Sequence, residues 1–236
     1  TRAAVCPVGS SCDRLGPRAA RDELREPARR DSLVVIARAT APPFYKNGFV
    51  LACDDTRQAA LIDPGDEVLD LEDIVRANGL TVTHILLTHG HIDHISGLAQ
   101  ARRSYPAAPI HLHRDDQFFV DHLVETGHRY GLAVEPAPPI DVYYTEGMSI
   151  PLGTSIVVRP HHTPGHCPGG VCLQVGSPSD PSGGRLLIVG DTLFAGSIGR
   201  TDLPGGDHAT LIRSITTTLF AFGDDAVVWP GHGAQT

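Results

Sequence analysis

Residues 88–94 read Thr88-His89-Gly90-His91-Ile92-Asp93-His94, and this stretch decides the class of fold. It follows the apolar run at residues 83–87, which predicts a buried strand, and it precedes residues 95–103, which have the periodicity of a helix. Four metal-capable side chains therefore lie in one strand-to-helix turn. Neutral imidazole and carboxylate groups suit zinc and other first-row metals. The spacing differs from the H-E-x-x-H helix of zinc proteases and predicts another type of metal site.

Three later segments each place a metal-capable residue at the end of a predicted strand. His166 follows the strand predicted at residues 155–159, Asp191 follows residues 186–189, and His232 follows residues 226–229. Glycine and proline beside each of them let the backbone turn sharply. Loops at strand ends commonly carry functional side chains on a rigid scaffold. Together with residues 88–94, these segments predict one shared metal site.

Short apolar runs, separated by Gly, Pro and Asp, alternate with helical patterns from residue 33 onward. The order falls into two comparable halves without an internal linker, so we expect one α/β domain over residues 32–236. Two packed sheets with helices outside would bury these faces, but periodicity alone does not distinguish this arrangement from a three-layer α/β sandwich. Residues 1–31 are expected to form an N-terminal extension, mobile or helical. They are rich in Arg but lack the apolar core of a secretory signal.

Composition excludes several classes of function. The net charge is −8, and because residues 1–31 carry +2, the remaining chain carries −10. An acidic body disfavours nucleic-acid binding, which needs a basic face. No apolar run approaches the ~18 residues of a membrane span. Five cysteines form no disulfide framework, which indicates a reducing compartment and predicts a cytoplasmic protein, with organellar import as the alternative.

The order of the motifs T-H-x-H-x-D-H, T-P-G-H, G-D-T and G-H resembles the metallo-β-lactamase superfamily over residues 33–236. The resemblance implies a four-layer αββα sandwich with a catalytic metal site at one edge. Residues 190–194 (GDTLF) and 199–202 (GRTD) look like glyoxalase II and its single-domain bacterial relatives, the hydroxyacylglutathione hydrolases. Residues 32–236 are thus expected to form a metallo-β-lactamase-like catalytic domain.

The resemblance implies seven metal ligands, three for each of two ions and one that bridges them. They are His89, His91 and His166 for the first ion, Asp93, His94 and His232 for the second, and Asp191 for the bridge. Two zinc ions are expected, with iron or manganese as alternatives at one or both positions. A metal-bridging hydroxide would attack a carbonyl carbon, with Asp93 and Asp191 as the catalytic carboxylates. Aspartate rather than cysteine at position 191 resembles the thioesterase and lactonase branches.

The resemblance also implies supporting roles for further residues. Arg200 matches the basic residue that holds the glutathione carboxylate in glyoxalase II, and Arg suits a bidentate carboxylate contact. The family tyrosine two positions later is replaced by Asp202, and another family tyrosine falls at Leu173. Asp63 and His162 are expected to hold ligand histidines in orientation by hydrogen bonds. The chain ends four residues after His232, so the C-terminal helical domain of larger glyoxalase II enzymes is not expected.

The predicted function is hydrolysis of a small-molecule thioester such as an S-2-hydroxyacylglutathione. A lactonase or other ester or β-lactam hydrolase on the same site is the first alternative. A mono-iron glutathione persulfide dioxygenase is the second, since those proteins share the GRTD pattern; Pro230-Gly231-His232 in place of Pro-Ala-His favours the hydrolase. A non-catalytic metal-sensing module is the third, and it is disfavoured because all seven ligand positions are filled.

Overall fold

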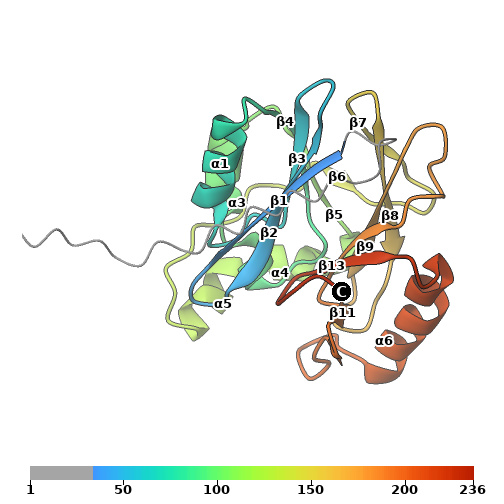
Figure 1. Cartoon of the computed structure of the whole chain (residues 1–236). Coiled ribbons are helices and arrows are strands. Elements are labelled where there is room, and N and C mark those ends of the chain that lie inside the picture. Colours follow the sequence, from blue (N-terminus) through green and yellow to red (C-terminus); the bar gives the residue numbers. More distant parts are fainter. Residues whose placement is uncertain (1–33) are drawn as a thin grey trace, which may run out of the picture.

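The computed structural model describes residues 34–236, and it places the first half of this region in a six-stranded sheet (Figure 1). The strands lie in the order β1-β2-β3-β4-β5-β6. Their bounds are β1 Val34–Ala41, β2 Lys46–Cys53, β3 Gln58–Ile62, β4 Thr81–Leu86, β5 Ile110–Leu112 and β6 Val142–Tyr143. Neighbours are antiparallel from β1 to β3 and parallel from β3 to β6. Parallel neighbours require crossover connections, and helices supply them between β3 and β4 and between β4 and β5.

The second half forms a five-stranded sheet in the order β13-β10-β9-β8-β7. Its strands are β7 Ile150–Leu152, β8 Ile156–His162, β9 Val171–Gly176, β10 Leu186–Gly190 and β13 Val227–Pro230. Only the pair β10 and β13 is parallel. A small hairpin of β11 (Leu193–Phe194) and β12 (Ser197–Ile198) follows β10.

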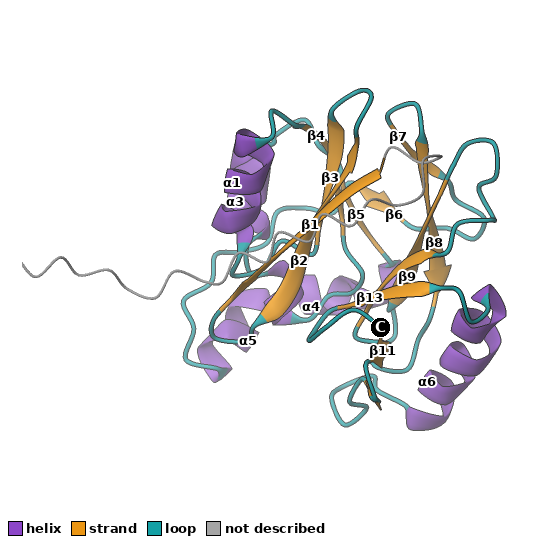
Figure 2. Cartoon of the chain, viewed as in Figure 1, coloured by secondary structure: helices purple, strands orange, loops and turns teal. Residues whose placement is uncertain are grey.

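Helices cover the outer faces of both sheets (Figure 2). Those on the first sheet are α1 Val68–Ala77, α2 Ile92–Ile95, α3 Leu98–Ser104, the 3₁₀ turn Arg114–Asp116, α4 Gln117–Asp121 and α5 Leu123–Arg129. Those on the second are α6 His208–Ser214, the π-helical turn Ile215–Leu219 and the 3₁₀ turn Phe220–Phe222.

Three apolar cores define the layers of the molecule. One core packs α1, α3 and α5 on the first sheet, with Leu71, Leu98 and Ile110 fully buried. A second lies between the sheets, where strand β2 contributes Phe49 and Leu51. The third packs α6 on the second sheet. Three cores between four layers confirm the predicted αββα sandwich.

The structure corrects several predicted elements. The helix expected at residues 115–126 is broken at His122 into α4 and α5, and the one at 95–103 is preceded by the separate turn α2. Strands β6, β7, β11 and β12 were not predicted, because two or three residues are too few to show a period. The extension predicted at residues 1–31 lies outside the described residues. None of the helices between residues 34 and 236 is long and apolar enough to cross a membrane.

Candidate metal centre

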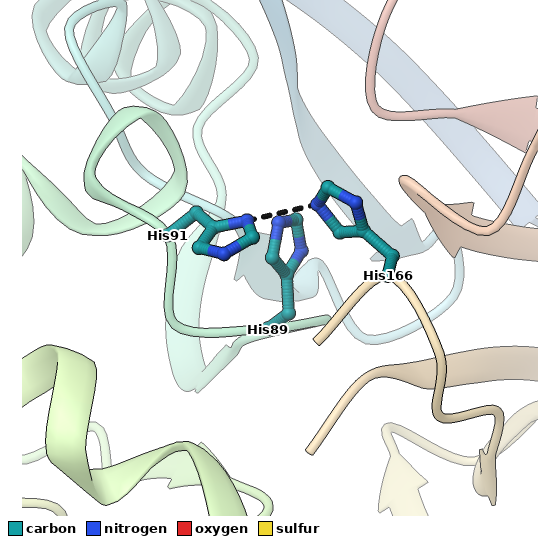
Figure 3. A group of neighbouring side chains, drawn as sticks. All are labelled: His89, His91 and His166. Carbon is teal, nitrogen blue, oxygen red and sulfur yellow. Dashed lines mark hydrogen bonds between the residues drawn. The ribbon is translucent and has the colours of Figure 1, made fainter. Parts of the chain in front are cut away.

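Three histidines converge at the edge where β4 and β8 end (Figure 3). His89 and His91 follow β4, and His166 follows β8. Nδ1 of His91 lies 2.8 Å from Nε2 of His166, and the ring of His89 is 5.0 Å from that of His166 between centroids. One donor atom from each residue lies within 4.8 Å of the other two. The structure therefore brings together the three side chains predicted for the first ion.

A second group lies against the first. Asp93 and His94 come from α2, and His232 follows β13. Oδ2 of Asp93 is 3.1 Å from Nε2 of His232 and 3.6 Å from Nε2 of His94. The rings of His89 and His94 are 3.9 Å apart between centroids, so the two groups are adjacent. These are the three side chains predicted for the second ion.

Asp191 lies between the two groups. Its Oδ1 is 3.4 Å from Nε2 of His94, and its Oδ2 is 3.6 Å from Nε2 of His166. Gly231 allows this close packing, because a Cβ at that position would fall 2.1 Å from Oδ1 of Asp191. Gly190 has a positive φ of 51°, a conformation that favours glycine. The Gly-Asp and Pro-Gly-His segments thus need their glycines for the approach of the side chains.

Buried donor atoms without partners indicate that the centre fits metal ions. Nε2 of His89, Nε2 of His94 and Oδ1 of Asp191 are buried and have no hydrogen-bond partner in the described structure. Buried polar atoms are rarely left unsatisfied in native proteins, and an ion is one of the accepted explanations. Imidazole nitrogens and carboxylate oxygens that face one another are the ligands zinc and iron take. The residues present fit a pair of divalent ions.

The surroundings of the site shift the pKa values of two predicted ligand histidines in opposite directions. Burial, followed by the neighbouring His166, lowers the pKa of His91 to about 3, although Asp93 and Asp191 oppose the shift. Burial also disfavours the charged form of His94, but the carboxylates of Asp93, Asp63 and Asp191 outweigh it and raise the pKa of His94 to about 10. His94 is therefore protonated at neutral pH in the ion-free protein, and metal binding must displace that proton.

Each of several ligand histidines has its second ring nitrogen fixed by a neighbour. Nδ1 of His94 lies 2.9 Å from Oδ2 of Asp63, and Nδ1 of His166 lies 2.8 Å from the carbonyl oxygen of Arg200. Nδ1 of His89 lies 3.1 Å from Oγ1 of Thr88. Such partners fix the tautomer and leave Nε2 free to bind a metal. Asp63 thus contacts one of the predicted ligand histidines.

Asp116 is a buried carboxylate that sequence reasoning missed. Its Oδ2 accepts a hydrogen bond from the N–H of Gly90 at 2.8 Å, and its Oδ1 accepts one from the N–H of Gly169 at 2.6 Å. It joins the loop of His89 and His91 to the loop of His166. Its position after β5 was a usable signal, because the same strand-end rule selected Asp191.

The only lysine of the chain also lies beneath the centre. Lys46 is 1 % exposed, forms an ion pair with Glu67 at 2.5 Å and donates to the carbonyl oxygen of Asp63. The side chain of the next residue, Asn47, donates to the carbonyl oxygens of Pro230 and Gly233, each at 2.9 Å. These contacts tie the start of β2 to the loop that carries His232. No pattern in the sequence marked Lys46, because its partners are distant in the chain.

Two predicted residues are placed differently from expectation. Nε2 of His162 donates a hydrogen bond to the carbonyl oxygen of Pro168, 2.8 Å away, and the ring stacks on His113 rather than on a ligand histidine. The prediction that His162 orients a ligand therefore finds no support. The guanidinium of Arg200 is exposed and forms a bidentate pair with Asp202, with both N–O distances at 2.7 Å. Arg200 contacts the centre through its carbonyl oxygen on His166.

The fold and the donor set define an αββα protein with a candidate divalent-metal centre, and comparison with known proteins gives the family. The profile of the Metallo-beta-lactamase superfamily matches residues 41–232. The chain therefore belongs to that superfamily.

Several relatives are matched over most of their length. An uncharacterised protein of Mycobacterium leprae is 38 % identical over 80 % of this chain and 87 % of its own. The hydroxyacylglutathione hydrolase GloC of Haemophilus influenzae is 35 % identical over 81 % and 88 %. The probable metallo-hydrolase YqgX of Bacillus subtilis is 34 % identical over 82 % and 88 %.

Solved structures give the same fold. The BLEG-1 B3 metallo-beta-lactamase superposes with a TM-score of 0.75 at 33 % identity, covering 86 % of this chain and 93 % of that one. TTHA1623 in a di-iron-bound form superposes with a TM-score of 0.72 at 32 % identity, covering 84 % and 93 %. These likenesses support the reading of the site as a divalent metal centre.

Proposed function

We propose that this protein is a dinuclear metal-dependent hydrolase that cleaves a thioester such as an S-2-hydroxyacylglutathione. The position of Asp191 carries the proposal, because its two oxygens face nitrogen donors of different groups, those of His94 and His166. A carboxylate between two ligand sets suits two ions better than one. When bound, such ions generate a nucleophile from water at neutral pH and polarise the scissile carbonyl.

The protein's own side chains have distinct roles around the reacting bond. His94, His89 and His166 hold their Nε2 atoms toward the centre because their Nδ1 atoms are fixed by Asp63, Thr88 and the carbonyl of Arg200, respectively. Asp93 and Asp191 are the carboxylates that orient the attacking water. A thiolate leaving group needs little help from a proton donor, so no further acid is required. Because an amide leaving group would need such an acid, the site favours a thioester over an amide.

The GloC relative, a hydroxyacylglutathione hydrolase, supports a glutathione thioester. Arg200 is the proposed contact for a substrate carboxylate, and its present partner is the carboxylate of Asp202. An anionic substrate must therefore displace Asp202 from the guanidinium. We infer that the substrate is a small acyl thioester whose anionic group is held only weakly at this position.

We also infer a cytoplasmic protein that uses zinc. The cysteines in the described part of the chain, Cys53, Cys167 and Cys172, are free thiols, as a reducing compartment would keep them. Zinc suits the mixed imidazole and carboxylate donors. Iron is the alternative, and the di-iron form of TTHA1623 supports it.

The test is a panel of substrates with metal analysis. Zinc-loaded protein is assayed with S-lactoylglutathione, a lactone and a β-lactam, and its metal content is measured. We expect two zinc ions per chain and a kcat/KM at least tenfold higher for the thioester. A preference for the β-lactam would instead support the activity named for BLEG-1. One iron per chain, with oxygen uptake on glutathione persulfide, would overturn the hydrolase.

Asp191→Ala tests the role of the bridging carboxylate. We expect turnover to be lost while the circular dichroism spectrum is retained, since the side chain lies at the edge of the fold. The exposed Asp225→Ala is the matched control and should keep full activity. Normal turnover in Asp191→Ala would contradict a two-ion centre.

A further inference from the structure

A second group of metal-capable side chains lies outside the seven ligands. It consists of His113, Asp115 and His162, each of which offers one donor atom within 4.8 Å of the other two. His113 follows β5 of the first sheet and His162 ends β8 of the second. The group therefore joins the two sheets at the edge of the sandwich that carries the metal centre.

We propose that His113, Asp115 and His162 bind a divalent first-row transition-metal ion at a site separate from the dinuclear centre. Two imidazoles and one carboxylate are a donor set that zinc, iron, nickel and copper accept. The proposal does not depend on the thioesterase activity, because it concerns different residues.

The ring of His162 is arranged as that of a metal ligand. Its Nε2 lies 2.8 Å from the carbonyl oxygen of Pro168, a group that only accepts hydrogen bonds. In the neutral ring Nε2 therefore carries the proton and Nδ1 carries the lone pair. Metal-binding histidines characteristically donate their other ring N–H to a backbone carbonyl in this way.

His113 supplies the second donor beside the carboxylate. Its Nδ1 accepts the backbone N–H of Asp115 at 3.3 Å, a long hydrogen bond that a bound ion would replace, and it lies 3.7 Å from Oδ2 of the same residue. Two ligands of one zinc ion, each about 2 Å from it, are separated by nearly the latter distance. The guanidinium of the intervening Arg114 stacks on the ring of Tyr143 at 3.8 Å. Burial and the adjacent His162 lower the pKa of His113, although Asp115 and Asp116 oppose the shift. The neutral form that a metal needs is thus favoured.

The two rings must rotate out of their stacked arrangement to share an ion. They now lie nearly parallel, with centroids 4.1 Å apart and planes at 10°. An ion in the plane of both rings requires rotation about the Cβ–Cγ bonds, and this torsion is broad in histidine. His162 and Asp115 are exposed, which leaves room for that movement and for water as a fourth ligand.

Binding at this site would act on the metal centre through the chain. Asp116 follows Asp115 directly and accepts hydrogen bonds from Gly90 and Gly169. His162 precedes the ligand His166 by four residues. An ion at this site would therefore link the loop that carries His89 and His91 to the loop that carries His166.

Zinc stoichiometry tests the proposal. Wild type, His113→Ala and His162→Ala are dialysed to equilibrium against 1 to 100 µM free zinc, and bound zinc is counted by atomic absorption. Exposed His128→Ala is the matched control. We expect both site variants to bind one zinc ion fewer per chain than wild type and control. Because this is a difference, it holds whatever the occupancy of the dinuclear centre.

Thermal unfolding provides a second readout. Zinc added beyond saturation of the dinuclear centre should raise the Tm of wild type and His128→Ala, because the ion links two sheets only in the folded state. His162→Ala, an exposed substitution, should lose this increment. Equal zinc content and equal Tm increments in all four proteins would overturn the proposal.

Discussion

Oδ2 of Asp63 lies 2.9 Å from Nδ1 of His94, and both side chains are fully buried. Oδ1 of the same carboxylate accepts the N–H of Thr88 at 2.6 Å, so Asp63 joins the end of β4 to a ligand in α2. The proton on Nδ1 of His94 is thereby fixed, and Nε2 is left for the metal. One carboxylate thus sets both the position and the tautomer of a ligand.

Asp63→Asn should selectively weaken binding of the second ion. The φ of Asp63 is 49°, a conformation that Asn tolerates, so the fold should persist. An amide N–H facing Nδ1 of His94 would force the proton onto Nε2, the atom that must bind metal. We expect ~10- to 100-fold weaker binding of one zinc ion, measured by competition with a chelator. Two unchanged affinities would contradict this role.

Asp116→Asn should selectively weaken binding of the first ion. Asp116 accepts from Gly90 and Gly169 through different oxygens, and Asn offers only one acceptor. One of the two loops would lose its anchor. We expect ~10-fold weaker binding at the site of His89, His91 and His166. Asp116→Asn should keep the affinity for the second ion, which Asp63→Asn loses. Loss of affinity for the same ion in both variants would contradict the view that Asp63 and Asp116 support different ion sites.

Lys46→Met should destabilise the fold strongly. It leaves the buried carboxylate of Glu67 without its cation, and breaking such a pair costs about 3 to 5 kcal/mol. The double variant Lys46→Met/Glu67→Gln removes both charges and should recover a large part of that loss. Urea unfolding of the metal-free proteins measures both. If the double variant is no more stable than Lys46→Met, the pair is not the cause.

Asp202→Asn should improve the use of anionic thioesters. The substitution removes the charge that pairs with Arg200 and frees the guanidinium. Because exposed ion pairs are weak, we expect only a ~2- to 5-fold lower KM for S-lactoylglutathione. The KM of a thioester without a carboxylate should not change, and an equal change for both substrates would contradict the proposed contact.

His111 should make stability depend on acidity. It is buried beside Tyr144 and His84, and burial followed by the nearby His84 lowers its pKa from 6.5 to about 4. Between pH 6.5 and 4 the unfolded chain binds more protons at this residue, so stability falls as the pH falls. In the metal-free protein, His111→Phe should reduce the drop in Tm over this range. An identical slope in both proteins would contradict the assignment.

The sequence by itself predicted sheets covered by helices and the candidate metal donors, whereas the four-layer order followed from the resemblance of its motifs to the superfamily. Alternating apolar runs and helical periods predict sheets covered by helices, because each amphipathic face must be buried. The ligands could be located because His89, His91, Asp93 and His94 lie together in one turn. Asp191 and His232 required the further rule that strand ends carry functional side chains.

Only the tertiary structure decided which distant groups meet. The pairing of Lys46 with Glu67, the bracing of Gly90 by Asp116 and the stacking of His113 on His162 depend on how the sheets and loops pack. Sequence periodicity describes which face of an element is buried, but not what that face contacts. Local pattern therefore predicted the ligands, whereas packing set their hydrogen-bond partners, their supporting charges and the group proposed to bind a third ion.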